Sequence, residues 1–175
     1  MKFISTHIKE IKIIEPEIFK DSRGFFFEYY HKEKFRDNGI IDFFVQSNHS
    51  KSIKNSLRGL HYQFPQAQGK LVRCISGEVL DVAVDIRKNS TTYCEWVSVK
   101  LNSENKKQLY IPPGFAHGFL VLSDYAEVIY QCTELYNPRN DNGIIWNDSN
   151  IKVEWGIEKP ILSKKDANLP PLESK

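Results

Sequence analysis

The stretch that decides the fold is Val79-Leu80-Asp81-Val82-Ala83-Val84-Asp85-Ile86-Arg87. Successive side chains of a strand point to opposite faces, so period-two alternation indicates a β-strand. One face of the predicted strand carries Leu80, Val82, Val84 and Ile86. The other face carries Val79 and Ala83 together with the carboxylates of Asp81 and Asp85. The stretch therefore predicts a strand with two acidic groups on one side.

Similar short runs, rich in β-branched and aromatic residues, continue in both directions and are separated by glycine, proline, asparagine and serine. This spacing is typical of an all-β sandwich or barrel. Strands are expected at residues 25–30, 43–47, 70–75, 79–86, 95–101, 109–111, 119–122 and 127–135. One helix is expected over residues 31–38, closed by Gly39, and a short one around residues 163–167.

The composition excludes several classes of protein. A chain of 175 residues with 41% hydrophobic and 26% charged residues fits one globular domain, residues 1–175. The net charge of +2 argues against a dedicated nucleic-acid or membrane surface. No apolar run approaches the roughly 18 residues of a transmembrane helix, and the start lacks a signal peptide. Three cysteines without a CxxC pair indicate reduced thiols and a cytoplasmic protein.

Two glycine-framed histidines stand out as candidates for chemistry. His61 follows Arg58 by three residues, and a histidine transfers protons near neutral pH while an arginine grips phosphates. A satisfied core histidine is the alternative for His61. Arg58 and His61 should point to opposite faces of a regular strand, so we expect a bulge at Gly59 that turns both into one cavity. The pair suggests an enzyme acting on a phosphorylated or nucleotide-linked molecule.

The second histidine and a tyrosine give weaker signals. His117, beside Gly118, is either a turn histidine or a ligand-binding residue, and binding is the preferred function. The phenol of Tyr130 is a poor base but a usable proton donor, although most strand tyrosines simply pack. Tyr130, Cys132, Glu134 and Tyr136 would share a face if their strand runs unbroken.

Metal and nucleotide-loop motifs are absent from the sequence. His61 is followed by Tyr62 and Gln63, so the His-x-His pair of many metal-binding β-barrels is missing. The sequence contains neither a glycine-rich phosphate loop nor a Gly-x-Ser-x-Gly elbow. Without the histidine pair we expect no metal. The basic residues are scattered along the sequence, so we also expect no nucleic-acid partner.

Ordered blocks along nearly the whole chain resemble the dTDP-4-dehydrorhamnose 3,5-epimerase family. The blocks are Asp21-Ser22-Arg23-Gly24-Phe25-Phe26, Phe44-Val45-Gln46-Ser47-Asn48-His49-Ser50, Leu57-Arg58-Gly59-Leu60-His61-Tyr62-Gln63, Gln68-Gly69-Lys70-Leu71-Val72-Arg73, Gly77 to Arg87, Pro113-Gly114-Phe115-Ala116-His117-Gly118-Phe119, Tyr130, Trp146-Asn147-Asp148 and Leu162-Ser163-Lys164-Lys165-Asp166. So many blocks in order make a chance match implausible.

The resemblance implies a cupin-type jelly-roll barrel and an epimerase of a nucleotide-linked 4-keto-6-deoxy sugar that needs neither cofactor nor metal. It implies that His61 is the base, Tyr130 the acid on the opposite face, Asp166 the carboxylate that orients His61, and Lys70 the cation at the enolate oxygen. It also implies five residues that bind the substrate: Gln46, Asn48, Arg58, His117 and Tyr136. The resemblance also implies a homodimer with strand exchange, in which Arg23, Phe26 and Glu28 contact the nucleotide of the partner subunit.

Three departures from the family pattern and three alternatives stay open at this point. Ser47 replaces a common Asp, Thr91 a common Pro, and Gly156 a frequent Pro. None removes a proposed catalytic group, but Ser47 lies between two expected ligand contacts. The alternatives are an epimerase of C3 or C5 alone, a keto-isomerase on the same barrel, and a non-catalytic sugar-nucleotide binding protein. The sequence leaves the nucleotide base and the final glycan open.

Overall fold

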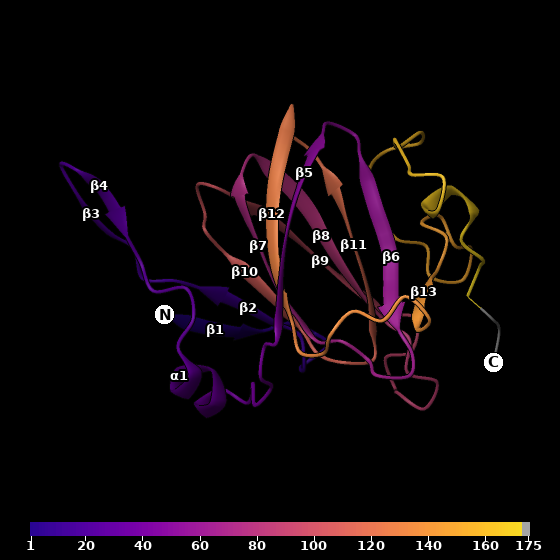
Figure 1. The fold of residues 1–175 in the computed structure, drawn as a ribbon, viewed down its shortest axis with the longest axis horizontal. Helices are drawn as coiled ribbons and strands as arrows, with labels where there is room; N and C mark the ends of the chain where they lie inside the picture. The colour runs from indigo at the N-terminus through magenta and orange to yellow at the C-terminus, as the bar shows by residue number, and fades with distance from the viewer. Residues whose placement is uncertain (173–175) are drawn as a thin grey trace.

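The structure, a computed structural model, describes residues 1–172 and contains two antiparallel sheets that face each other (Figure 1). The six-stranded sheet has the order β1 (Lys2–Ser5), β2 (Lys12–Glu15), β10 (Gln108–Ile111), β7 (Lys70–Ser76), β12 (Tyr125–Cys132) and β5 (Gln46–Ile53). The five-stranded sheet has the order β13 (Asp141–Gly143), β6 (Leu57–Gln63), β11 (Phe115–Val121), β8 (Glu78–Asp85) and β9 (Trp96–Asn102). The expected all-β jelly roll is confirmed.

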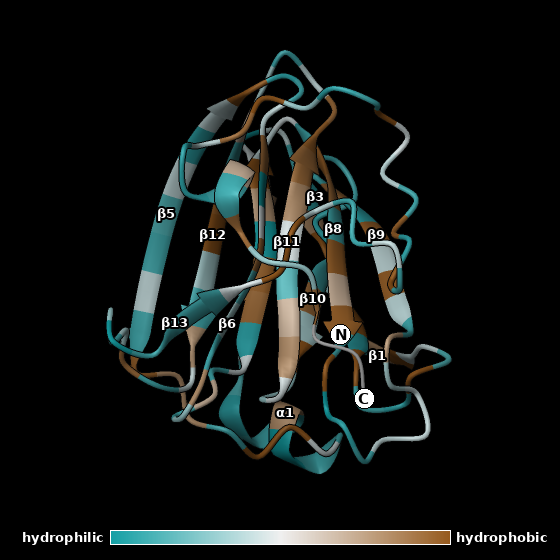
Figure 2. Ribbon diagram, turned by 90° about the vertical axis from the view of Figure 1, so that its right-hand side faces the viewer, coloured by the Kyte–Doolittle hydropathy of each residue, from teal (hydrophilic) through white to brown (hydrophobic). Residues whose placement is uncertain are grey.

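Strand β8 lies inside the five-stranded sheet, and its alternation matches the prediction. Val79 and Ala83 face the six-stranded sheet and belong to the apolar core between the two sheets. Val82 and Val84 face the other way, into a second core. Each buried aliphatic side chain contributes about 1.5–3 kcal/mol relative to an exposed one. Figure 2 shows β8 and β11 as largely apolar, whereas β5 at the sheet edge is polar along much of its length.

The second core is covered by the chain after β13, which crosses the outer face of the five-stranded sheet. Ile144, Ile151 and Trp155 are buried there against β8 and β11. The segment is tied to the start of β6, because the backbone N–H of Leu57 donates to the carbonyl of Ile161 at 3.0 Å. In Figure 1 this part of the chain, in yellow, lies beside β6 and β13. The crossing brings the C-terminal residues next to the strand that carries His61.

Both expected helices are present, with adjusted ends. The first is α1 (Lys32–Asp37), with His31 as its N-cap and Asn38 as its C-cap. Gly39 follows with φ +83°, a conformation that favours glycine, so the predicted stop is confirmed. The second is a single 3₁₀ turn, η1 (Asp166–Asn168), which begins later than the predicted residues 163–167.

Two predicted strands near the N-terminus were too long or displaced. In place of a strand over residues 25–30, a hairpin of β3 (Phe19–Asp21) and β4 (Gly24–Phe26) projects from the body of the molecule (Figure 1). The chain beyond β4 forms no ladder and is held at Tyr29 by two side chains. Gln108 donates to the carbonyl of Tyr29 at 2.7 Å, and the guanidinium of Arg73 stacks on the ring of Tyr29. The strand predicted at residues 43–47 begins at Gln46 instead.

The strands that carry the two later candidates also differ from their predicted bounds. Strand β11 begins at Phe115, four residues before the predicted start at residue 119, so His117 lies inside a strand and not in a turn. Strand β12 ends at Cys132, before the predicted end at residue 135. The unbroken strand that would place Tyr136 on the face of Tyr130 is therefore not formed, and Tyr136 lies in the following loop.

Candidate active site

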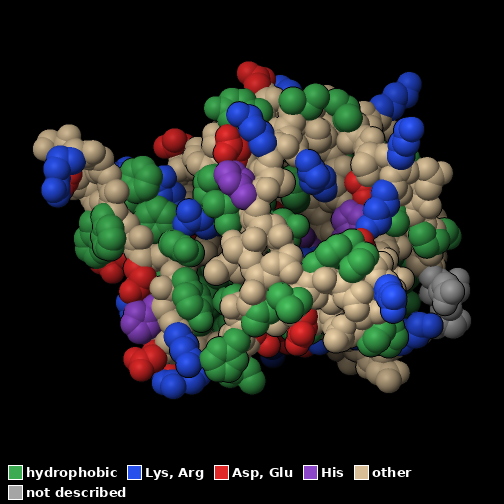
Figure 3. Space-filling view, in the orientation of Figure 1, with side chains coloured by type: hydrophobic (Ala, Val, Ile, Leu, Met, Phe, Trp, Pro, Cys, Tyr) green, Lys and Arg blue, Asp and Glu red, His purple; other side chains and the backbone are tan. Residues whose placement is uncertain are grey.

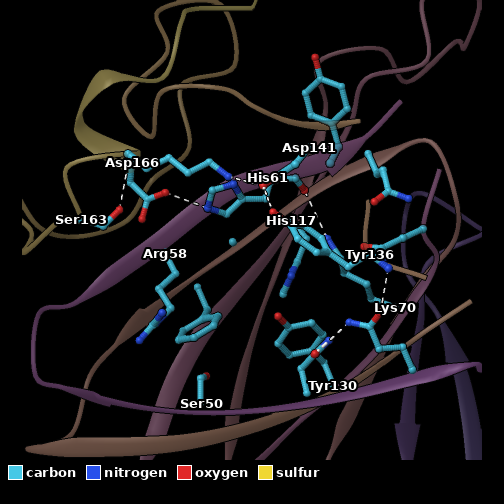
Figure 4. A pocket seen from close by; sticks show the side chains of 18 residues that line it. Ser50, Arg58, His61, Lys70, His117, Tyr130, Tyr136, Asp141, Ser163 and Asp166 are labelled. Carbon is cyan, nitrogen blue, oxygen red and sulfur yellow. Dashed lines mark hydrogen bonds and ion pairs between the residues drawn. The ribbon is translucent and has the colours of Figure 1, made fainter. Parts of the chain in front are cut away.

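A polar pocket of about 470 Å³ opens between the two sheets (Figures 3 and 4). Basic and histidine side chains are visible around the hollow in the face shown in Figure 3. Nine of the twelve predicted site residues line the pocket: Gln46, Asn48, Arg58, His61, Lys70, His117, Tyr130, Tyr136 and Asp166. They come from strands and loops that are far apart in the sequence, and the jelly roll brings them together.

His61 is held by a carboxylate from the C-terminal crossing. Its Nε2 lies 2.8 Å from Oδ1 of Asp166, and Asp166 is itself fixed by a hydrogen bond from its backbone N–H to Oγ of Ser163. Burial works against ionisation of Asp166, but the contact with His61 outweighs it, so the pKa of this carboxyl is below its usual range. The side chain of His61 is 30% exposed toward the pocket. With Nε2 engaged, Nδ1 is the ring nitrogen left to take a proton.

The expected irregularity at Gly59 is present and brings Arg58 and His61 into the same pocket. In the β6–β11 pairing, His61 lies opposite His117 and Arg58 opposite Phe119, so the register shifts between the two pairs. Gly59 has φ +118°, and a Cβ added there would lie 2.6 Å from Cα of Gly118. The two strand backbones approach closely here because both positions are glycine.

His117 is buried and paired with the predicted acidic face of β8. Its Nε2 lies 2.9 and 3.0 Å from the two carboxylate oxygens of Asp81, which is fully buried. A buried charge requires such a partner, and the pair fixes the imidazole ring at the pocket wall. Of the two alternatives that the sequence left open for His117, a turn histidine is excluded, because Gly118 faces Gly59 across the pairing and His117 lies within β11.

Tyr130 and Lys70 lie on the wall opposite His61. His61 belongs to the five-stranded sheet, whereas Tyr130 and Lys70 belong to β12 and β7 of the six-stranded sheet. Burial raises the pKa of Tyr130, so its phenol stays protonated at neutral pH. Burial lowers the pKa of Lys70, whose ammonium group lies 3.4 Å from the carbonyl oxygen of His61. Figure 4 shows the histidine and the tyrosine on facing sides of the pocket.

Amide side chains form the part of the pocket next to Tyr130. Gln46 donates to Oδ1 of Asn48 at 3.0 Å and accepts a hydrogen bond from the backbone N–H of Tyr136 at 2.8 Å. Arg58 donates from Nε to Ser52 at 2.9 Å, and this leaves the rest of its guanidinium fork available for an anion. These groups offer neutral and cationic donors to a polar ligand.

Nine other residues line the pocket and are outside the predicted set: Ser50, Tyr62, Gln63, Gln68, Gly118, Phe119, Asp141, Ser163 and Lys165. Asp141 is the most consequential of them, because its carboxylate accepts hydrogen bonds from both Tyr136 and Lys165. In the sequence it belongs to a polar loop, Asn137-Pro138-Arg139-Asn140-Asp141-Asn142, where nothing distinguishes it from a turn residue.

The remaining three predicted site residues lie outside the pocket of their own chain. Arg23 is in the turn between β3 and β4 and pairs with Asp21 at 2.6 Å. Phe26, in β4, is 69% exposed. Glu28 follows the hairpin and pairs with Lys34 at 2.7 Å.

The residues that the structure describes, 1–172, offer neither a metal cluster nor a membrane-spanning helix. No group of three or more His, Cys, Asp or Glu side chains in that range is arranged to hold a metal ion. No helix in that range is long and apolar enough to cross a membrane.

Comparisons with known proteins agree with the geometry. A family model described as dTDP-4-dehydrorhamnose 3,5-epimerase matches residues 5–174. Relatives of that name in Shigella flexneri and Salmonella typhimurium are each 54% identical, over 96% and 99% of this chain and 94% and 96% of their own lengths.

A solved structure extends the likeness to the whole fold. The crystal structure of dTDP-6-deoxy-D-glucose-3,5-epimerase from Legionella pneumophila, in complex with dTDP-4-keto-L-rhamnose, superposes with a TM-score of 0.95 at 49% identity. The match covers 98% of this chain and 92% of that one. With the family model spanning nearly every residue, the chain belongs to the dTDP-4-dehydrorhamnose 3,5-epimerase family.

Proposed function

We propose that this chain is an isomerase that inverts C3 and C5 of dTDP-4-dehydro-6-deoxy-D-glucose to give dTDP-4-dehydro-L-rhamnose, in dTDP-rhamnose biosynthesis. The observation that carries the proposal is the arrangement of one pocket. The His61–Asp166 pair lies on one wall, and the protonated phenol of Tyr130 lies on the other. Inversion of a carbon next to a ketone needs a base and an acid on opposite faces of the sugar ring.

In this proposal, His61 is the base. The ketone at C4 acidifies the protons on C3 and C5, and a neutral imidazole nitrogen is a suitable acceptor near pH 7. The carboxylate of Asp166 holds Nε2–H, which directs Nδ1 toward the substrate and stabilises the imidazolium that forms. Positioned acid–base groups of this kind contribute about 10²–10⁴-fold in rate.

Lys70 stabilises the enolate that follows proton removal. The C–H bond breaks, its electron pair forms the carbon–carbon double bond, and negative charge develops on the C4 oxygen. An ammonium group in a buried site stabilises such a charge more strongly than water does. Burial lowers the pKa of Lys70, and a developing oxyanion beside the group favours its protonated form.

Tyr130 completes the inversion by giving a proton to the opposite face of the enolate. Return of the proton from His61 would only regenerate the substrate. The remaining polar residues hold the sugar nucleotide in register: Arg58 and His117 provide donors for the diphosphate and sugar, and Gln46, Asn48 and Tyr136 line the wall beside Tyr130. Binding energy from the remote diphosphate positions the reacting carbons.

The test is incubation of the purified chain with dTDP-4-keto-6-deoxyglucose in deuterated water, followed by NMR of the sugar. Inversion with deuterium at both C3 and C5 is the expected result. Deuterium and inversion at one carbon alone would identify a single-centre epimerase. Binding without any deuterium incorporation would contradict the proposal and support a non-catalytic binding protein.

We further propose that the active assembly is a homodimer in which the β3–β4 hairpin contributes to the partner's pocket. The hairpin stands away from the body of the chain in Figure 1 and carries three exposed aromatic residues, Phe19, Phe25 and Phe26. Exposed apolar groups of this kind mark interaction surfaces. Arg23, in the turn of this hairpin, does not line the pocket of its own chain, so we propose that it acts in the pocket of the partner.

Mixing two impaired variants tests this exchange. Arg23→Ala and His61→Ala are each expected to be defective as homodimers. In a mixed dimer, the subunit with an intact His61 receives an intact Arg23 from its partner, so about a quarter of wild-type activity should return after co-refolding. A mixture of His61→Ala with Lys70→Ala, which alter the same pocket, should not recover. A monomer by light scattering, or no recovery in the first mixture, would contradict the proposal.

We also place this reaction in the cytoplasm, where sugar nucleotides are built. The cysteines support that placement: Cys74 and Cys132 are buried thiols that belong to no disulfide. Reduced thiols persist in reducing compartments. Fractionation of the cells that make the chain, followed by immunoblotting, tests the placement.

A further inference from the structure

Asp141 joins three separate segments at the mouth of the pocket. It lies in β13, whose Gly143 pairs with His61 of β6. Its Oδ2 accepts a hydrogen bond from the hydroxyl of Tyr136 at 2.8 Å and another from the ammonium group of Lys165 at 2.5 Å. Tyr136 comes from the loop after β12, and Lys165 immediately precedes Asp166, the partner of His61. One carboxylate therefore holds a residue of the loop that follows the strand of Tyr130 and the neighbour of the carboxylate that pairs with His61.

The charge of Asp141 also acts on groups across the pocket. Burial works against its ionisation, but the hydrogen bonds from Lys165 and Tyr136 outweigh it and hold the pKa of Asp141 below its usual range. The hydrogen bond to Asp141 raises the pKa of Tyr136. For Tyr130, burial is the largest cause of a raised pKa, and the charge of Asp141 adds to it.

The other titratable or charged groups that face these tyrosines come from five strands and from the C-terminal crossing. Strand β6 contributes Arg58 and His61, β7 contributes Lys70, and β12 contributes Cys132. The remaining groups are His117 with Asp81, from β11 and β8, and the C-terminal pair Lys165 and Asp166. Arg58 lowers the pKa of Tyr130, so it opposes Asp141. The carboxylate of Asp141 is the acidic group that accepts the hydrogen bond from the hydroxyl of Tyr136.

We infer that Asp141 is a positioning residue of the epimerase, which orders Tyr136 and Lys165 at the pocket mouth through its two hydrogen bonds. The inference rests on the proposed function, because it assigns Asp141 a part in proton return to the enolate. The hydrogen bonds of Asp141 go to Tyr136 and Lys165, and its role does not require contact with Tyr130 or the reacting carbons. Its influence passes through the neighbours that it holds and through its charge.

Asp141→Asn keeps the size of the side chain and removes its charge. With ¹³Cζ-labelled tyrosine, we expect both Tyr130 and Tyr136 to titrate at lower pH in Asp141→Asn than in the wild type. The signals are assigned from Tyr130→Phe and Tyr136→Phe spectra. We also expect kcat to fall about 10-fold, the size of effect produced by losing hydrogen bonds to a charged group. The alkaline limb of its pH profile should move to lower pH, because the acid loses its proton sooner.

Two further variants separate this role from a structural one. Glu134→Gln removes one exposed carboxylate from the loop between β12 and β13, outside the pocket, and should leave the titrations and kcat unchanged. Asp141→Glu keeps the negative charge, so the alkaline limb of its pH profile should lie close to that of the wild type. Unmoved tyrosine titrations, or an unmoved kcat, in Asp141→Asn would overturn the inference. The tyrosine titrations can be measured without turnover. An inactive wild type would therefore refute the proposed function, and the titrations would still decide whether Asp141 acts on the tyrosines.

Discussion

Replacing His61 with alanine is expected to lower epimerisation by about 10³–10⁴-fold, the upper part of the range for a positioned acid–base group. The variant loses the nitrogen that removes the C3 and C5 protons, and its Asp166 has no imidazole to orient. Deuterium incorporation from solvent should fall by the same factor as inversion, because carbon-proton abstraction precedes both. The measurement is NMR of the sugar nucleotide in deuterated water, with initial rates for both processes.

The matched control is His49→Ala. His49 is also a strand histidine paired with a carboxylate, at 3.0 Å from Glu127, but it is exposed and lies outside the pocket. Its loss should leave turnover unchanged. Equal thermal unfolding midpoints for the two variants would show that the defect of His61→Ala is chemical. Substantial activity in a folded His61→Ala protein would remove His61 from the role of base.

Alternation within single strands was enough to predict much of the fold. In β8, the period-two pattern separated Val82 and Val84 from Val79 and Ala83, and the structure buries the two sets in different cores. The prediction worked because a strand between two apolar layers must bury both faces. It failed for residues 27–30, where the aromatic run continues but the structure shows no ladder beyond Phe26. A strand needs a partner, and the sequence of a single segment does not reveal its partner.

The site was predictable where the side chain itself is distinctive, and it was missed where only geometry gives the residue a role. Histidine and arginine beside a glycine drew attention to Arg58 and His61, and the bulge expected at Gly59 is present. Asp141 gave no signal, because an aspartate in a polar loop is a common turn residue. Its role depends on β13 pairing with β6, which places it between Tyr136 and Lys165. That pairing joins residues about eighty positions apart.

The role of His117 shows a second limit of the sequence. Two flanking glycines usually indicate a turn, yet Gly118 lies within β11 because it packs against Gly59. The contact partner of His117 was present in the fold-deciding stretch as Asp81, one of two carboxylates predicted to share a face. Only the β8–β11 pairing, which was not predicted, shows that these residues meet. Paired acidic and basic groups on separate strands are therefore recognisable only after the strand order is known.

Replacing Tyr130 with phenylalanine is expected to separate two processes that His61→Ala abolishes together. His61 remains able to remove a substrate proton, and its imidazolium can exchange that proton with solvent and return deuterium to the same face. Net inversion, which needs a donor on the opposite wall, should fall by about 10²–10³-fold. Deuterium incorporation with retained configuration should fall much less. The ratio of exchange to inversion, measured by NMR at C3 and C5, is the observable.

Tyr125→Phe is the matched control, because Tyr125 begins the same strand, is exposed, and lies outside the pocket. Its exchange-to-inversion ratio should equal that of the wild type. The ratio reports the side of the ring on which the proton arrives. A general loss of substrate binding would lower the exchange rate and the inversion rate equally and leave the ratio unchanged, whereas loss of the acid raises it. An unchanged inversion rate in Tyr130→Phe would assign the acid to another group, and Tyr136, another phenol of the pocket, would be the next residue to substitute.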